Sequence, residues 1–200
     1  MGMRLDRAGL LRRVAAQFAA ARVERPERCD PHEAATCRSR LCLSMPRWLA
    51  GLSALGPVLY VPCATPGTLR GRPLPGLLVG SIDLAPLLHT RVLAFASAIT
   101  ADGPREWMEC RDAAERALAR LYLLPDTDYL AWDALCCRAA AAPAFDADLD
   151  VSQPTGARVL RFRLDRFVAG LQLLDADADV DASPLCRDVA ARIARHATPR

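Results

Sequence analysis

Residues 47–98 consist of short apolar runs separated by glycine and proline, and this texture restricts the fold more than any other feature of the sequence. The runs read "PVLYVP", "LLVGSIDL" and "RVLAFASA", and "TPGTLRGRPLPG" separates the first two. Short apolar runs bounded by turn-forming residues are typical of strands. The sequence "DGP" at residues 102–104 predicts the end of the last strand. We therefore expect short antiparallel strands in this part of the chain.

Helical patterns flank the expected strands. The spacing of apolar residues predicts an amphipathic helix over residues 5–22, whereas residues 24–46 follow no regular period and are expected to be a connector. A second helix is predicted over residues 105–124, with Trp107 as a core residue on its inner face. The run "DYLAWDALCCRAAAA" predicts a third helix. Helices therefore close both ends of the expected sheet.

The C-terminal part repeats this order of elements. "ARVLRFRLDRFVAGLQLL" predicts a strand pair, and Ser183 and Pro184 are suited to open a terminal helix. "RVLAF" is echoed by "RVLRF", and "CRDAAERALAR" at residues 110–120 is echoed by "CRDVAARIARH" at residues 186–196. Two pairs of similar segments in the same order are consistent with a duplicated strand-helix unit. The alternative is that a composition rich in Ala and Arg produces each similarity by chance.

The predicted fold class is α+β, with short antiparallel strands closed by helices and preceded by an N-terminal amphipathic helix. Length and apolar content, 52 % of the residues, suit one domain or two small ones. We expect an N-terminal helix and connector over residues 1–46 and a β-rich domain with a closing helix over 47–124. A second strand-helix unit is expected to pack on that domain over 125–200.

Residues 47–122 resemble a pleckstrin-homology domain in the order of their landmarks. "RWLAGLSALGPVLYV" is similar to the early strands, and "PGLLVGSIDL" is similar to the middle strand pair. "RVLAFASAITADGPREWMECRDAAERAL" is similar to a last strand and a closing helix that buries a tryptophan. The resemblance implies a bent sheet plugged by that helix, and a partner that is either a lipid headgroup or a protein.

The amino-acid composition excludes some kinds of catalysis and some kinds of partner. All 26 basic residues are arginines, and the chain has eight cysteines and a net charge of +3. The absence of lysine excludes a phosphate-binding loop with its lysine and Schiff-base catalysis. Acids are interspersed with the arginines, so a nucleic-acid partner is not expected. This composition resembles that of proteins from GC-rich large DNA viruses.

The sequence also predicts the cellular compartment of the protein. No apolar run reaches the roughly 18–20 residues that a membrane span needs, and charges interrupt the N-terminal segment. We therefore expect an intracellular protein, cytoplasmic or nuclear, without a transmembrane segment. In these compartments cysteines stay reduced, either buried as small apolar residues or bound to a metal.

Three cysteines and one histidine lie close enough in the sequence to be candidate ligands of one metal ion. Cys29, His32, Cys37 and Cys42 are ligand types that zinc prefers, but their spacing matches no paired Cys-x-x-Cys motif. Zinc is the one cofactor that the sequence allows, and otherwise no cofactor is expected. The alternative is a set of unrelated thiols in a connector.

A second candidate site contains arginines alone. The resemblance to pleckstrin-homology domains implies that Arg38, Arg40 and Arg47 bind a phosphoinositide or another anion, with association of the chain at a membrane surface. Pro46 interrupts this run, and the lysines common among lipid-binding members are absent. Anion binding by these arginines is therefore kept as an alternative.

The leading hypothesis is a noncatalytic protein that binds another protein, of viral or host origin. Trp48, Tyr60 and Trp132 are residue types that interfaces prefer as anchors, and no catalytic motif is recognised. A viral accessory or virion-associated, tegument-like factor is the expected role. The alternatives are a zinc-stabilised module on the cysteine cluster and a phosphoinositide-binding module on the arginines.

Overall fold

The described part of the chain belongs to one compact unit, which spans residues 34–200. A computed structural model gives the coordinates. The other unit, residues 1–33, lies outside the described residues, and with it the predicted helix over 5–22. The structure describes residues 36–41, 45–64, 73–100, 102–136, 153–166, 170–178 and 181–197.

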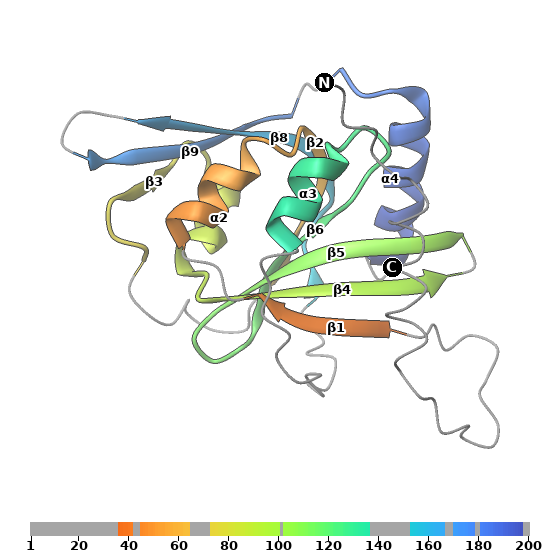
Figure 1. Ribbon diagram of the computed structural model, residues 1–200, viewed down its shortest axis with the longest axis horizontal. Coiled ribbons are helices and arrows are strands. Elements are labelled where there is room, and N and C mark those ends of the chain that lie inside the picture. The colour runs from red at the N-terminus through yellow and green to blue at the C-terminus, as the bar shows by residue number, and fades with distance from the viewer. Residues whose placement is uncertain are drawn as a thin grey trace, which may run out of the picture. The chain divides into compact units, whose positions relative to one another are not determined.

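The described strands form one mixed sheet in the order β1-β4-β5-β6-β2-β8-β9-β3, with β7 paired to β2 (Figure 1). All pairings are antiparallel except that of β3 with β9. The strands are β1 (Thr36–Leu41), β2 (Pro57–Ala64), β3 (Leu77–Val79), β4 (Val92–Thr100), β5 (Gly103–Arg111), β6 (Ala117–Tyr122), β7 (Gln153–Pro154), β8 (Arg158–Arg166) and β9 (Gln172–Asp177).

Helices cover both faces of this sheet. Helices α2 (Met45–Leu52) and α3 (Tyr129–Cys136) and the 3₁₀ helix η1 (Ile82–His89) pack on one face, which we call the α2 face. Helix α4 (Pro184–Ala197) packs on the other, the α4 face. Among the described residues, no helix is both long and apolar enough to cross a membrane.

Alternating residues of the central strands feed two separate cores. On β2, Tyr60 joins the large core under α2, whereas Leu59 joins the smaller core under α4. This alternation follows from the two-residue period of a strand. The smaller core is completed by Ala182, just before α4, and by one side of that helix, namely Cys186, Ala190 and Ile193.

Local hydrogen bonds explain where α3 begins. The Asp128 carboxylate accepts hydrogen bonds from the backbone N–H groups of Leu130 and Ala131 at 2.9 and 3.0 Å, as an N-cap does. The preceding turn is held by Thr127, whose buried hydroxyl donates to the carbonyl of Pro57 and accepts from the N–H of Leu124. The β6–α3 connection is therefore tied to the start of β2.

Several expectations about elements are confirmed. The α+β class, the strands at β2, β4, β8 and β9, the helix at α3 and the terminal helix after Ser183 are all present. The Ser183 hydroxyl accepts from the N–H of Cys186 at 3.1 Å, which is the expected N-cap. Within the predicted connector, however, residues 36–41 form strand β1. The predicted domain boundaries after residues 46 and 124 stay a prediction.

The predicted helix over residues 105–124 is wrong, because this segment is the β5–β6 hairpin. The apolar residues that were assigned to one helical face are divided between the two faces of the sheet. Met108 and Cys110 belong to the large core, whereas Trp107 is only partly buried and packs at the smaller one. Charged residues at 109 and 111 alternate with these apolar ones, and this two-residue period decides for a strand.

This hairpin also corrects the proposed duplication and the resemblance to a pleckstrin-homology domain. The echo at residues 110–120 is strand and turn, whereas its counterpart at 186–196 lies in α4. The two segments therefore have similar amino-acid compositions but different secondary structures. The closing helix that the resemblance requires is absent at Trp107, since that residue pairs with Tyr122 across the hairpin.

Helices α2 and α3 approach closely at Gly51. A Cβ atom at this position would lie 2.3 Å from Cδ2 of Leu135, which is buried at 6 % exposure. Alanine would improve helix propensity by about 1 kcal/mol. Overpacking of a core costs roughly 1–3 kcal/mol, so the steric term exceeds the gain.

We expect Gly51→Ala to lower the free energy of unfolding by about 1 kcal/mol in urea titrations, because the Leu135 side chain must move. In a Leu135→Ala background the clash is gone, and the same substitution should become stabilising. Ala50→Ser, at an exposed position of the same helix, is the control and should change little. A destabilisation that persists without Leu135 would contradict this account.

Helix α4 is attached through a carboxylate from another segment. Asp126 accepts hydrogen bonds from the Ser183 N–H at 2.6 Å and from the Ser183 hydroxyl at 2.8 Å. The backbone hydrogen bond from Ser183 is the main cause that lowers the pKa of Asp126. A lowered carboxyl pKa means that the bond stabilises the fold above the ordinary value near 3.9. The stabilisation is lost as the pH falls through the lower, folded-state pKa.

We expect Asp126→Asn to loosen the start of α4 by about 1 kcal/mol, since the amide removes one acceptor and partial exposure keeps the effect small. The measurement is the protection factor of the α4 amides in hydrogen exchange, that is, the intrinsic exchange rate divided by the observed one, which should fall in the variant and, in the wild type, below about pH 4. Asp128→Asn is the matched control, because asparagine caps a helix equally well. Equal exchange in both variants would argue against the attachment.

Candidate anion-binding site

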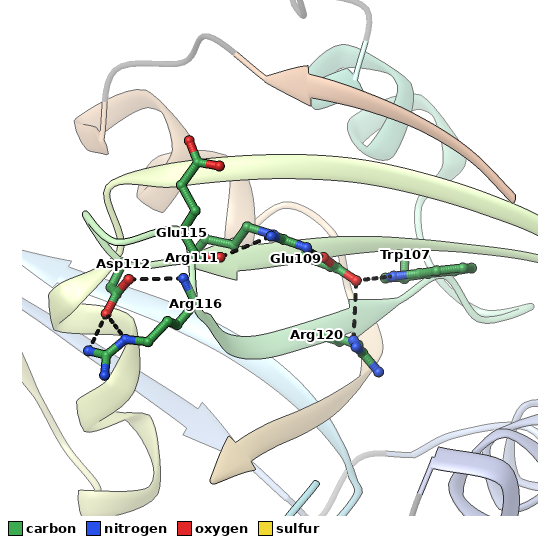
Figure 2. A network of polar contacts seen from close by, with 7 residues as sticks. All are labelled: Trp107, Glu109, Arg111, Asp112, Glu115, Arg116 and Arg120. Carbon is green, nitrogen blue, oxygen red and sulfur yellow. Dashed lines mark hydrogen bonds and ion pairs between the residues drawn. The ribbon is translucent and has the colours of Figure 1, made fainter. Parts of the chain in front are cut away.

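A buried carboxylate lies at the centre of the polar residues on the α4 face (Figure 2). Glu109 of β5 is 0 % exposed. It accepts hydrogen bonds from Nε1 of Trp107 at 3.1 Å and from Nε of Arg111 at 3.0 Å. Nε of Arg120, on the neighbouring strand, lies 3.3 Å from the same oxygen that Trp107 contacts. One carboxylate therefore organises an indole and two guanidinium groups.

The electrostatics of this group follow from its partners. Burial alone would raise the pKa of Glu109, but the hydrogen bond from Arg111 and the charge of Arg120 outweigh it and lower the pKa. The carboxyl group is therefore ionised at neutral pH. Burial on its own would lower the pKa of Arg120, whereas Glu109 beside it raises the pKa overall. Both ions are thus stabilised by each other.

A tight turn sets the position of Arg111. The Asp112 carboxylate accepts from the backbone N–H groups of Ala114 and Arg116 at 2.8 and 3.0 Å and from Nε of Arg116 at 2.8 Å. Glu115 adopts a left-handed backbone with φ of 62°, and its carbonyl accepts from Nη1 of Arg111 at 2.9 Å. The strained turn is therefore held by Asp112 and returns a contact to the site.

Arg120 is the accessible cation of the site. Its side chain is 19 % exposed, against 4 % for that of Arg111. Nε faces Glu109, and the terminal nitrogens lie away from that carboxylate (Figure 2). A guanidinium group carries five donors in a planar fork. Arg120 can therefore present donors to an anion while Glu109 keeps it in place.

A pair of aromatic rings adjoins this cation. Trp107 and Tyr122 pair across the hairpin, with ring centroids 5.6 Å apart and planes inclined by 31°. Arg120 is two residues from Tyr122 on the same strand, and the same face of the sheet carries both. Trp107 is partly exposed, whereas Tyr122 is buried at 8 % exposure. The site therefore combines a positive group with a flat apolar surface.

The residues expected to anchor a protein partner lie in the interior. Trp48, Tyr60 and Trp132 are 0, 0 and 1 % exposed and belong to the large core. The Tyr60 ring packs edge-on against Phe162, and that of Trp132 packs against Phe95. Aromatic residues are preferred in cores as well as in interfaces, and these three pack in the core. The prediction that these three residues are anchors at the surface is therefore corrected, because their side chains are buried.

Only one of the four predicted zinc ligands lies in the part of the chain that the structure describes. Cys37 lies on β1 opposite Ser97, whereas Cys29, His32 and Cys42 lie outside the described residues. Across the described ranges, no three side chains of histidine, cysteine, aspartate or glutamate are grouped as metal ligands.

The three predicted anion-binding arginines fall on two different elements. Arg38 and Arg40 are on β1, paired with Ala96 and Ala94 of β4, whereas Arg47 is on helix α2. Sequence analysis missed Glu109 and Arg120. The signal that was present is "ECR" at residues 109–111, because opposite charges two residues apart share one face only in a strand.

Comparisons with known proteins give a partial likeness of fold. No family model and no curated protein matches the chain. Similar solved structures include the heme-degrading enzyme ChuS of Escherichia coli O157:H7, with TM-score 0.40, 20 % identity and coverage of 57 % of this chain and 37 % of that one. A second structure of ChuS, described there as an E. coli heme oxygenase, has TM-score 0.40 and 21 % identity and covers 58 % of this chain and 39 % of that one. The heme-binding protein PhuS of Pseudomonas aeruginosa has TM-score 0.39 and 20 % identity and covers 66 and 40 %.

These comparisons correct several expectations. This chain spans about two fifths of the chain in each of the three structures, and the two proteins, ChuS and PhuS, are described as heme proteins of bacteria. The expectations of a pleckstrin-homology fold and of a viral, tegument-like, protein-binding role are therefore wrong. The expectation of zinc or no cofactor is contradicted by the same neighbours. The expectation that the chain is not an enzyme is contradicted as well, because ChuS is described as a heme-degrading enzyme and as a heme oxygenase.

We expect Glu109→Gln to lower the free energy of unfolding by about 3–5 kcal/mol at pH 7, because a neutral amide leaves buried guanidinium groups without their counter-ion. Urea titration measures the loss. The wild type should lose the same contribution in acid. Since the pKa of Glu109 is lowered by folding, the stabilisation is present above the ordinary value near 4.3 and disappears as the pH falls through the folded-state pKa.

Glu106, on the same strand but the opposite face, provides a control with the reverse sign. Burial is the main cause that raises its pKa, and Asp133 adds to the effect. A raised carboxyl pKa means that the fold favours the neutral form, so stability falls as the pH rises through that pKa. Glu106→Gln should therefore be at least as stable as the wild type at pH 7, with a smaller difference at pH 4. Similar losses in both variants would refute the role given to Glu109.

Proposed function

We propose that the chain binds a flat organic anion on the α4 face, with a carboxylate of the ligand on Arg120 and its ring system against Trp107. One observation carries this proposal. Arg120 is oriented by a fully buried carboxylate through Nε, yet its side chain remains 19 % exposed. The guanidinium group also hydrogen-bonds Tyr122, and its other terminal donors can serve an external acceptor with little loss of conformational freedom on binding.

The chemistry of the site favours a carboxylate over a neutral group. The planar guanidinium fork matches two carboxylate oxygens, and hydrogen bonds between charged groups are stronger than neutral ones. Glu109 holds the positive group through an ion pair to its Nε at 3.3 Å. The ligand therefore meets a donor pair that is already organised.

The neighbouring rings favour a flat ligand. Trp107 and Tyr122 form a tilted pair beside Arg120, and the indole is held by its hydrogen bond to Glu109. Aromatic surfaces attract other flat rings by stacking and by removal of apolar area from water. A carboxylate attached to an extended ring system satisfies both parts of the site.

Heme is the ligand class that we choose to test, because it combines a flat ring with carboxylates and the partly similar solved structures are described as heme proteins. Arg120 and Trp107 would hold a carboxylate and the ring. Bound heme supplies redox-active iron. His89 ends η1 on the α2 face, and His196 contacts Asp102 at 3.8 Å. Neither described histidine is among the contacts of Glu109 or Arg120, so we assign no iron ligand.

We expect the full chain to bind hemin and iron-free protoporphyrin IX with similar affinities, since the proposed contacts involve the carboxylate and the ring. Arg120→Ala should weaken both by about 10- to 100-fold, the effect of losing one charged hydrogen-bonding group. Absorbance and Trp fluorescence titrations measure the affinities.

The matched control is Arg105→Ala, on the same face of β5. Its guanidinium donates to the carbonyls of Pro104 and Asp102 at 3.0 Å each, away from Glu109. This variant removes one positive charge from the same face and should leave binding unchanged. Equal weakening in Arg105→Ala and Arg120→Ala would indicate unspecific attraction and reject the site. Undiminished binding by Arg120→Ala would reject it as well.

A further inference from the structure

Glu106 places an acidic side chain on the α2 face of the sheet, where helix α3 also packs. Met108, two residues along the same strand, belongs to the large core, and Glu106 itself is only partly exposed. The register pairs Glu106 with Ser97 of β4, and its carbonyl accepts from the N–H of Leu123 at 3.0 Å. The carboxyl group therefore projects from a central strand that has a neighbour on each side.

Helix α3 presents to this carboxyl group two side chains that become negative when they ionise. Asp133 and Tyr129 are one helical turn apart, and both lie within electrostatic reach of Glu106. Trp132 lies between them in the sequence and is 1 % exposed. Its buried indole nitrogen is beside Glu106 but makes no hydrogen bond of normal geometry. The sequence of α3, "YLAWDALC", contains no basic residue.

Among the described side chains, no positive group opposes this arrangement. The ion pairs of β5 involve Glu109 and Arg111 on the other face of the sheet. Burial is the main cause that raises the pKa of Glu106. The contact with Trp132 lowers this pKa by less, and the charge of Asp133 raises it further. Ionisation of Glu106 therefore puts a charge against α3 that no described partner neutralises.

The remaining attachment of α3 to the sheet is apolar and small. The Trp132 ring packs against Phe95 of β4, with centroids 6.4 Å apart, and Leu135 is buried against α2. The helix has only eight residues, Tyr129–Cys136. A helix this short depends on tertiary contacts for its stability. Local opening of such an element costs less free energy than opening of central strands.

We infer that α3 is a pH-sensitive lid over Phe95 and the adjoining part of the large core, closed while Glu106 is neutral and opened more often once Glu106 is ionised. Opening gives the carboxylate access to water and moves Trp132 away from Phe95. This inference is independent of the proposed anion site, because Glu106 lies on the opposite face of the sheet from Arg120.

The direction of the pH dependence follows from the raised pKa of Glu106. Closure of α3 is fully stabilised below the ordinary carboxyl pKa near 4.3, where Glu106 is neutral in both the closed and the open state. This stabilisation is lost as the pH rises through the higher pKa of the closed state. Asp126 at the start of α4 has a lowered pKa and stays ionised over the same range.

Hydrogen exchange of the full chain from about pH 4 to about pH 8 tests the lid, with rates expressed as protection factors. We expect the α3 amides to lose protection several-fold as the pH rises, while the amides of β2, β5 and α4 lose little. In E106Q the protection of α3 should not change with pH, because glutamine cannot ionise. Urea titration verifies that each variant is folded.

Two further variants each remove one negative charge from α3 or its cap. Asp133 lies within reach of Glu106, whereas Asp128 is exposed and caps the helix. D133N should therefore reduce the loss of α3 protection at high pH. D128N is the matched control and should keep the wild-type loss, since asparagine caps a helix equally well.

Three results would overturn the inference. The first is a wild-type chain in which the protection of α3 is equal at about pH 5 and about pH 8. The second is an E106Q variant with the wild-type pH dependence, which assigns the effect to another group. The third is an equal loss of protection in α3, β2 and β5, because that result is a loss of global stability and not the opening of a lid.

Discussion

The buried Glu109 carboxylate is the interaction on which the central hairpin and the proposed site both depend. Removing an ion from water is costly unless its partners are close and well aligned. Here Arg111 contacts it from the same strand and Arg120 from the next one. Because the two guanidinium groups come from both strands of the hairpin, the ion pairs fix β5 and β6 relative to each other. The same contacts decide where the remaining donors of Arg120 are presented.

The turn between these strands follows from a second carboxylate. The Asp112 carboxylate accepts hydrogen bonds from two backbone N–H groups and from the Arg116 side chain. These bonds hold the turn in which Glu115 has a left-handed backbone. In an isolated peptide the same residues favour a helix, since Ala, Arg and Glu have high helix propensity. The hairpin therefore depends on burial of the neighbouring strands, which local propensity does not include.

The comparison of residues 110–120 with 186–196 makes this dependence concrete. Both begin "CRD" and continue with Ala and Arg. In the second segment Ser183 caps the helix and Asp126 anchors it, and one apolar side packs on the smaller core. In the first, the same type of residues supplies a strand, a turn and a second strand. The partners that each segment meets after folding decide between the two structures.

Position relative to α4 explains why the site lies at Arg120. The helix covers β2 and β8 through Cys186, Ala190 and Ile193, and Tyr122 closes that core on the side of β6. Trp107 packs at the edge of the same core and stays partly exposed. The rings are therefore rigid because they belong to a core, and accessible because they stand at its border. A binding surface benefits from both properties.

The sequence alone determined the elements whose signals are local. Apolar runs bounded by glycine and proline predicted β2 and β4, and Ser183 with Pro184 predicted the start of α4, because turns and caps depend on adjacent residues. Only the tertiary structure decided the β5–β6 hairpin, the burial of Trp48 and the grouping of Glu109 with Arg120. Each of these depends on contacts between strands or layers, whose energy comes from packing and desolvation. Arg38 and Arg40 could be chosen by residue type, but their pairing with Ala96 and Ala94 of β4 follows from a strand register that no local pattern encodes.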